Sequence, residues 1–252
     1  MRALLYVFFL LAGTLAVPVQ AATPNVDARS LIQGMEHLLW GKTSHGNFTM
    51  RIETEYWTRT LTLEAWMDRP HKTLIRIHSP HKEQGIGSLR IGDQMWNYLP
   101  KVERTIKIPP SMMLQPWMGS NFSNDDLVKE SSFTHDYDHR IIASESSDGR
   151  TIYTIESTPK PNAAVVWSRL VFRIRDDEIP VSLTYYGERN KAVKRIDYDQ
   201  VRTVGGHRLP TRWTMTDAND PKRRTVIEIQ NLEFDIAIAP DVFSLERLRN
   251  PQ

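Results

Sequence analysis

The segment richest in groups that bind metals or transfer protons is His135-Asp136-Tyr137-Asp138-His139. Its two imidazoles and two carboxylates are side chains that can ligate metals or act as acids and bases. In an extended strand, however, successive side chains point to opposite faces, so the histidines would be separated from both aspartates. We therefore interpret the segment as a polar entry to a strand, with His135 and His139 at the surface rather than in a catalytic or metal site.

Most other arrangements that perform chemistry are missing from the sequence. The 252 residues include no cysteine, which excludes disulfides, thiolate metal sites and cysteine nucleophiles. No Gly-x-Ser-x-Gly motif, glycine-rich phosphate loop or His-Glu-x-x-His motif occurs. Lys and Arg number 32 against 30 Asp and Glu, and this near balance argues against nucleic acid as a partner. The sequence predicts a protein with no catalytic residues, no metal and no cofactor.

Residues 109–122 interrupt the predicted strands without a charged residue and contain three methionines, two aromatic residues and three prolines. Methionine is flexible and polarizable, so it suits surfaces that accept ligands of different shapes. Two interpretations remain open: a short helical plug at the end of a barrel, or a movable lid whose apolar side chains face the sheet and touch a lipid. The side chains that would touch it are Met112, Met113, Leu114, Trp117, Met118 and Phe122.

Alternation of apolar and polar residues dominates the chain after residue 47 and predicts β-strands. In the first two strands, the apolar positions that share a face are Phe48, Met50, Ile52 and Tyr56, then Leu61, Leu63, Ala65 and Met67. Further strands are predicted at residues 72–79, 85–92, 94–99, 102–108, 139–146, 150–158, 166–175, 180–187, 192–203, 207–217 and 223–235. Trp96 and Tyr98 share a face by the same rule, and we predict that they line the ligand cavity together with Met50 and Ile52.

One amphipathic helix is predicted before the strands, over residues 27–40. Asp27 can cap its start and Gly41 can end it, and its apolar positions are Leu31, Met35, Leu38 and Leu39. Short turns rich in Gly, Asn and Asp separate consecutive strands, which is typical of antiparallel hairpins. We therefore predict a mainly β protein with a single curved antiparallel sheet. The N-terminal helix and the short helical lid would cover its concave face around a hydrophobic cavity.

The first 21 residues have the pattern of a cleaved signal peptide. A basic start at Arg2 precedes an apolar run over residues 3–16, and Val19-Gln20-Ala21 places small residues at a cleavage site. The run is shorter than the roughly 20 residues that span a bilayer, so a membrane anchor is the weaker alternative. No change of composition marks a second domain, so residues 22–252 are predicted to form one domain in the periplasm.

Residues 96–127 carry the most specific similarity to a known family. The matching residues are Trp96-Asn97-Tyr98-Leu99-Pro100, Arg104, Ile108, Pro109-Pro110-Ser111, Gly119-Ser120-Asn121-Phe122-Ser123, Asp126-Leu127 and, at the end, Pro240-Asp241-Val242-Phe243-Ser244-Leu245. With them the sequence resembles the LolA-like family of periplasmic outer-membrane lipoprotein-sorting proteins. The resemblance implies an incomplete β-barrel whose helices cover a cavity for acyl chains. It also implies an arginine that secures the lid, for which Arg51, Arg76 and Arg104 remain candidates, and it leads us to expect an acidic residue where this chain has Asn121.

We therefore predict a non-catalytic periplasmic carrier that binds the acyl chains of lipoproteins or lipids and moves them from the inner toward the outer membrane. An inner-membrane transporter complex would load the carrier, and an outer-membrane acceptor would receive its cargo. Two alternatives remain: a sensor or adaptor of the same fold that works with a transporter without moving cargo, and an enzyme acting on lipids. The cargo itself stays open among lipoprotein acyl chains, a phospholipid, a glycolipid and a hopanoid-like lipid.

Overall fold

The computed structural model describes residues 26–129, 133–163 and 165–250. The predicted signal peptide lies outside these residues. The strands are β1 (Thr43–Glu53), β2 (Thr58–Asp68), β3 (Lys72–Ser79), β4 (Gly87–Ile91), β5 (Gln94–Leu99), β6 (Arg104–Lys107), β7 (Tyr137–Ser147), β8 (Arg150–Pro159), β9 (Arg169–Arg175), β10 (Pro180–Tyr186), β11 (Ala192–Val204), β12 (His207–Asp217) and β13 (Arg224–Phe234). The helical elements are α1 (Ala28–Trp40), η1 (Pro100–Val102), η2 (Pro110–Met112), η3 (Trp117–Gly119), α2 (Asn124–Lys129), α3 (Phe133–Asp136), η5 (Glu188–Asn190), η6 (Pro240–Phe243) and α4 (Leu245–Arg249).

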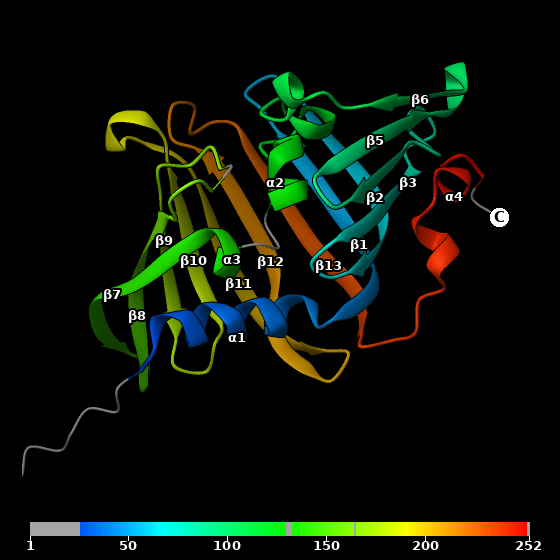
Figure 1. The fold of residues 1–252 in the computed structure, drawn as a ribbon. Helices are drawn as coiled ribbons and strands as arrows, with labels where there is room; N and C mark the ends of the chain where they lie inside the picture. Colours follow the sequence, from blue (N-terminus) through cyan, green and yellow to red (C-terminus); the bar gives the residue numbers. More distant parts are fainter. Residues whose placement is uncertain (1–25, 130–132, 164, 251–252) are drawn as a thin grey trace, which may run out of the picture.

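In the described part of the chain, the strands form one antiparallel sheet in the order β6-β5-β4-β3-β2-β1-β13-β12-β11-β10-β9-β8-β7. Neighbouring strands are joined by hairpins except at the centre, where β1 pairs with β13. The edge strands β6 and β7 do not pair with each other, so the curved sheet remains an open barrel. This confirms the predicted single antiparallel sheet. Figure 1 shows α1 and α2 on the same side of the sheet, within its curvature.

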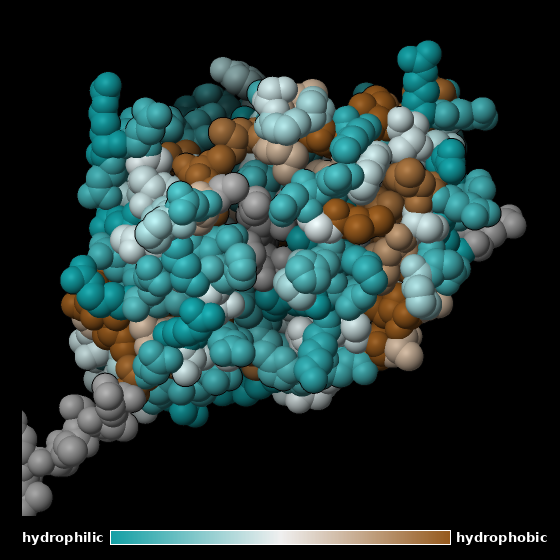
Figure 2. All heavy atoms as spheres, viewed as in Figure 1, coloured by the Kyte–Doolittle hydropathy of each residue, from teal (hydrophilic) through white to brown (hydrophobic). Residues whose placement is uncertain are grey.

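The helix α1 forms where the sequence predicts it. The Asp27 carboxylate accepts a hydrogen bond from the Ser30 backbone N–H at 2.8 Å, which caps the first turn. Gly41 ends the helix with a φ of 61°, a conformation that glycine adopts at little cost. The buried positions include Leu31, Ile32, Met35 and Leu39. Polar residues cover the outer side of α1 in Figure 2, so its apolar stripe packs inward onto the sheet.

A second, smaller core lies on the opposite face of the sheet. Leu74 and Leu89, from β3 and β4, pack there against Phe243 and Leu248 near the end of the described chain. The buried Arg76 fastens this segment, because its Nη2 donates to the Arg247 carbonyl at 2.7 Å. The C-terminal helix α4 therefore covers the convex side of the sheet, where the sequence analysis placed no element.

Several predicted boundaries differ from the structure. The predicted strand at 102–108 begins only at Arg104, because the turn η1 precedes it. Residues 133–136 form the short helix α3, so the entry to β7 is helical and not extended. Among the described residues, none of the helices has the length and hydropathy needed to cross a bilayer.

Candidate functional site

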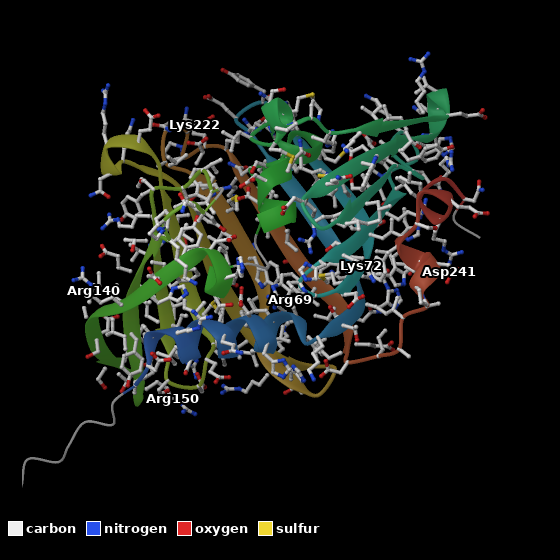
Figure 3. The ribbon with its side chains drawn as sticks, viewed as in Figure 1. Arg69, Lys72, Arg140, Arg150, Lys222 and Asp241 are labelled. Carbon is white, nitrogen blue, oxygen red and sulfur yellow. The ribbon has the colours of Figure 1, made fainter. Side chains whose placement is uncertain are left out.

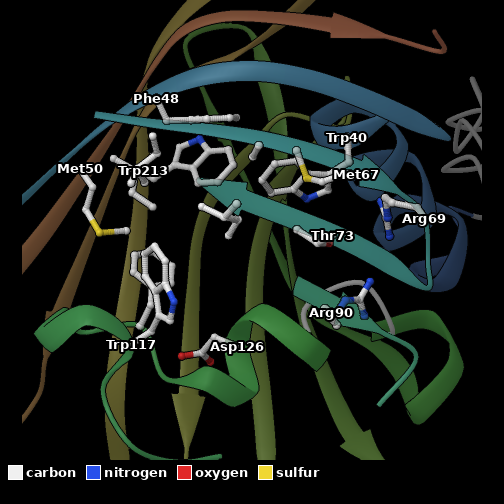
Figure 4. A pocket seen from close by; sticks show the side chains of 15 residues that line it. Trp40, Phe48, Met50, Met67, Arg69, Thr73, Arg90, Trp117, Asp126 and Trp213 are labelled. Carbon is white, nitrogen blue, oxygen red and sulfur yellow. The ribbon is translucent and has the colours of Figure 1, made fainter. Parts of the chain in front are cut away.

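An apolar cavity of about 120 Å³ lies between the concave face of the sheet and the segment from Trp117 to Asp126. Figure 4 shows how side chains from the sheet, from the end of α1 and from this segment converge on it. The apolar lining residues are Trp40, Phe48, Met50, Leu63, Ala65, Met67, Ile75, Trp117, Phe122, Trp213 and Ile227. Removing an apolar group from water is favourable in such a space, so the cavity suits hydrocarbon.

The central strands provide much of this lining because of their register. Phe48 on β1 lies opposite Leu63 on β2, and Met50 on β1 lies opposite Ile227 on β13. Every second residue of a strand points to the same face, so these neighbours form a continuous apolar surface. At one side of it, the rings of Trp40 and Trp213 meet edge to face at 4.9 Å between centroids.

Trp117 closes the cavity from the side opposite the sheet. Its side chain is buried although it belongs to a segment that covers the sheet. The indole Nε1 donates to the Ser88 hydroxyl at 3.0 Å, and that hydroxyl donates to Asn97 Oδ1 at 2.7 Å. Because the one polar atom of the ring is paired, its remaining surface can face hydrocarbon without an unsatisfied donor.

We call residues 110–129 the lid. Backbone hydrogen bonds within it include Trp117 N–H to the Phe122 carbonyl at 2.7 Å. Ser123 caps α2, since its hydroxyl accepts from the Asp126 N–H at 3.2 Å. Asn121, where the family resemblance led us to expect an acid, joins the lid to β13 because its side-chain oxygen accepts from the Thr225 hydroxyl at 2.8 Å.

Arg59 on β2 fastens the lid to the sheet. Its Nη2 donates to the Met118 carbonyl, and Met118 and Gly119 turn that carbonyl toward it with φ angles of 49° and 72°. The three arginines that the sequence left as candidates lie elsewhere. Arg51 pairs with Glu53, Arg76 holds the C-terminal segment, and Arg104 is exposed.

A buried ion pair joins the lid to the sheet at a second place. Asp126 on α2 binds the ammonium group of Lys194 on β11. The Asp126 carboxylate also accepts from the Ser123 N–H at 2.7 Å, while the Lys194 ammonium lies 4.6 Å from the ring centres of both Trp167 and Tyr185. Asp126 lines the cavity. The negative charge of Asp126 is therefore balanced by the ammonium group of Lys194 within the cavity wall.

The other end of the cavity is cationic. Arg69 and Arg90 both line it, with Thr73 opposite Arg90 in the β3–β4 register. The Arg69 Nη1 donates to the Glu36 carbonyl at 2.8 Å, and its Nη2 lies 3.4 Å from the Glu36 carboxylate. Burial, together with the nearby Arg69 charge, lowers the pKa of Arg90 to about 10, so it stays protonated at neutral pH.

A protein-family model described as an uncharacterized protein matches residues 69–250, more than half of the sequence. The chain belongs to this family. No curated protein matches the sequence significantly.

Solved structures show that this family member has the LolA-like fold. A DUF1329 family protein from Desulfovibrio piger superposes with a TM-score of 0.79 at 22% identity, over 88% of this chain and 97% of that one. A LolA superfamily protein from Nitrosomonas europaea gives 0.75 at 19% identity, over 88% and 99%. A Vibrio parahaemolyticus domain described as a candidate outer membrane lipoprotein-sorting protein gives 0.75 at 18%, over 88% and 98%. The fold implied by the sequence resemblance is therefore confirmed.

Within this LolA-like fold, three of the predicted ligand-contacting residues line the cavity. They are Met50, Trp117 and Phe122. Ile52 is fully buried in the same core but does not line the cavity. That these residues contact a ligand stays a prediction.

The predicted positions of Trp96 and Tyr98 are wrong. Both pack against the smaller core on the convex face, with Leu89 and Phe243. Their intervening neighbour Asn97 faces the cavity side instead, where it accepts the hydrogen bond from Ser88. Alternation showed correctly that the two aromatic residues share a face, but it does not reveal which face is concave.

The lid also differs from its prediction. Met113 and Met118 pack against the main core while remaining partly exposed. Met112 and Leu114, by contrast, are 45% and 55% exposed, so they do not face the sheet. The lid therefore has an apolar outer surface as well as an apolar inner one.

His135 and His139, the two histidines of the segment 135–139, have different environments. His135 is exposed on α3, as expected. His139 is half-buried, and its Nδ1 lies 2.7 Å from the Ser157 hydroxyl. Burial lowers the pKa of His139 to about 4. The interpretation of His139 as a surface residue is therefore wrong.

Sequence reasoning did not identify Trp40, Trp213, Arg59, Arg69 or Arg90 as site residues. Trp40 lies at the end of the predicted helix and Trp213 in a predicted alternating strand. For both, a large aromatic residue in an amphipathic element indicated burial. The arginines had no such signal, because a charged residue in an alternating strand, such as Arg59 or Arg90, or in a turn, such as Arg69, normally indicates the solvent face.

Replacing Arg59 by alanine is expected to loosen the lid. A hydrogen bond from a charged donor contributes about 1.5–3 kcal/mol, and Arg59 is partly exposed, so we expect the lower part of this range. The backbone amides of residues 117–122 should exchange hydrogen roughly tenfold faster. The matched control is Arg51→Ala, which removes an arginine that pairs within β1. Equal exchange in both variants would show that Arg59 does not hold the lid.

Proposed function

We propose that this protein is a periplasmic carrier that binds an acyl chain in the cavity beneath the lid and moves it from the inner toward the outer membrane. The observation that carries the proposal is the apolar cavity, which combines two edge-to-face tryptophans, alternating strand residues and the inward Trp117. Exposing an acyl chain to water costs about 0.8 kcal/mol of free energy per CH₂ group, so a chain of roughly sixteen carbons would need such burial to cross the periplasm.

The size of the cavity supports a lid that moves on loading. An engineered cavity of about 150 Å³ in another protein accommodates benzene, so a space of about 120 Å³ is too small for a complete acyl chain. Displacing Trp117 and the lid would extend the space. Polar side-chain contacts with Arg59, Lys194, Ser88, Thr225 and Arg223 fasten the lid, and hydrogen bonds and ion pairs of this kind are ones that a loading machine could exchange.

The surface next to the lid suits hand-over to partners. Tyr56 and Trp57, at the β1–β2 turn, are 88% and 47% exposed. The Arg59 guanidinium lies 5.7 Å from the Trp57 ring centre and also binds the lid. The exposed apolar side chains of the turn and of the lid, Met112 and Leu114, would meet an inner-membrane transporter and an outer-membrane acceptor.

Filling the cavity should weaken binding. Ala65→Phe places a ring into the lining and is expected to weaken binding of a fluorescent fatty-acyl probe at least tenfold, about 1.4 kcal/mol. The matched control is Ala143→Phe on the exposed side of β7, which should bind as the parent does. Overpacking costs about 1–3 kcal/mol, so circular dichroism must show that the sheet persists. Equal binding by both folded variants would exclude this cavity as the site.

A transfer assay separates the carrier from the adaptor. If the protein is a carrier, the rate at which the probe moves from donor to acceptor vesicles should rise with protein concentration. An adaptor would bind the probe without accelerating transfer. Hydrolysis of a lipid ester by the protein would instead favour the enzyme alternative.

A further inference from the structure

We propose that the cavity selects amphiphiles with an anionic headgroup, a carboxylate or a phosphate, and that Arg69 and Arg90 bind this headgroup. The inference rests on the proposed function and narrows its ligand class. It separates fatty acids and anionic phospholipids from lipids whose polar part is neutral.

The two arginines lie together at one end of an otherwise apolar space. Figure 4 shows Arg69, Thr73 and Arg90 grouped on one side of the cavity, away from Trp117 and Met50. In Figure 3, Arg69 lies within the curvature of the sheet near the end of α1, whereas Arg140 and Arg150 lie at the periphery. The cavity therefore has a polar end and an apolar end, as an amphiphile does.

Contacts in the wall hold both guanidinium groups in place. Arg69 is bound to the Glu36 carbonyl, and the Arg90 Nη2 donates to the Pro70 carbonyl at 2.6 Å. A guanidinium has five N–H donors in a fixed plane, so it can bind a wall group and a ligand oxygen together. Arginines that are already oriented lose little side-chain entropy on binding a ligand.

At this end of the cavity the lining residues include the two arginines but not the acids beside them. Glu36 lies beside Arg69 and Asp93 acts on Arg90, yet neither acid is among the residues that line the cavity. Asp126 is the one lining acid among the described residues, and it is bound to Lys194. An anion entering from the cavity would meet two guanidinium groups and no facing carboxylate at that end.

Hydrocarbon alone would be a poor ligand for this end. Both guanidinium groups already make contacts in the wall, and an alkyl chain would add neither an acceptor nor a charge to these contacts. A carboxylate or phosphate provides charge-assisted acceptors that match the guanidinium plane. The acyl groups of a lipoprotein are joined through neutral ester and amide linkages, so they would lack this contact.

The test compares a fatty acid with its neutral derivative. Cis-parinaric acid and its methyl ester share one fluorescent chain and differ in the headgroup charge. The parent protein should bind the acid at least tenfold more tightly than the ester. Competition by a lysophosphatidic acid and by the chain-matched monoacylglycerol tests the phosphate in the same way, and the stronger anionic competitor identifies the headgroup.

Two arginine variants test whether Arg69 and Arg90 cause the preference for the acid over the ester. Arg90→Gln and the double variant Glu36→Gln/Arg69→Gln, which avoids leaving a buried carboxylate alone, should bind acid and ester with equal affinity. Arg140→Gln, a surface control on β7, should keep the preference. The anion site would be overturned if the parent bound acid and ester with equal affinity, or if both arginine variants kept the preference for the acid. Neither result would contradict binding of an acyl chain in the cavity. Failure of the parent to bind either probe would overturn the proposed function as well.

Discussion

Replacing Lys194 by methionine is expected to lower the free energy of unfolding by about 3–5 kcal/mol, because it leaves a buried carboxylate without its cation. Asp126 and Lys194 are both almost fully buried, at 3% and 6% exposure. Methionine preserves most of the lysine stem, so the packing against Trp167 and Tyr185 changes little. The expected loss of stability is therefore caused by removing the positive charge of Lys194 and not by a change in side-chain volume.

The double variant Asp126→Asn/Lys194→Met should recover most of that loss. Replacing both partners of a buried pair by neutral groups removes the desolvation cost together with the attraction. Chemical denaturation of the parent, Asp126→Asn, Lys194→Met and the double variant gives a complete double-mutant cycle. Lys191→Met, at an exposed position near the start of β11, is the matched control and should change stability by less than about 0.5 kcal/mol. A loss in Lys194→Met as small as in this control would mean that water already reaches the pair.

The pair also connects stability to access to the cavity. Asp126 belongs to the lid helix α2 and Lys194 to the sheet, so the ion pair spans the boundary that would open for loading under the proposed function. In Asp126→Asn/Lys194→Met the lid should open more often although the protein remains folded. Faster association of the fluorescent acyl probe would reveal this.

Glu36 is expected to make the protein less stable as pH rises from 4.5 to about 7. Burial on α1 raises the pKa of this carboxyl group from 4.5 to about 7, despite the opposing charge of Arg69. Between these values the folded state keeps a proton that the unfolded state has released, so the free energy of unfolding falls with rising pH. The contribution is fully present below pH 4.5 and lost above pH 7, and it amounts to about 3 kcal/mol.

The variant Glu36→Gln isolates this effect. The free energy of unfolding of the variant, minus that of the parent, should increase by about 3 kcal/mol from pH 4.5 to pH 8 in denaturant titrations. His139→Gln is a control of opposite sign. The pKa of His139 is lowered to about 4, so the parent gains stability from it between pH 4 and 6.5, and the corresponding difference should decrease. A difference for Glu36→Gln that stays constant with pH would mean that Glu36 is ionised throughout.

The sequence determined the elements of this protein through local patterns. Alternating residues and turn signals predict the single antiparallel sheet, and the spacing of Leu31, Met35 and Leu39 predicts α1. These patterns are readable because a strand has a period of two and a helix a period of about 3.6 residues. Residues 109–122 stood out by composition alone, since this uncharged segment rich in methionine and proline interrupts the strands.

Tertiary structure alone decided the two faces of the sheet. Alternation groups Trp96 with Tyr98, but only the direction of curvature puts them on the convex face with Phe243. Likewise, composition does not show that Met112 and Leu114 are exposed while Trp117 and Phe122 are buried. Curvature arises from the twist summed over all strands, and no local window of sequence contains it.

Tertiary structure also assembled the polar contacts of the site. Arg59 meets the Met118 carbonyl, and Lys194 meets Asp126, across separations of 59 and 68 residues. In the sequence each of these charges looks like an ordinary solvent-facing residue of a strand or turn. Their roles follow from burial, because a charge removed from water must find a partner wherever the fold brings one within reach.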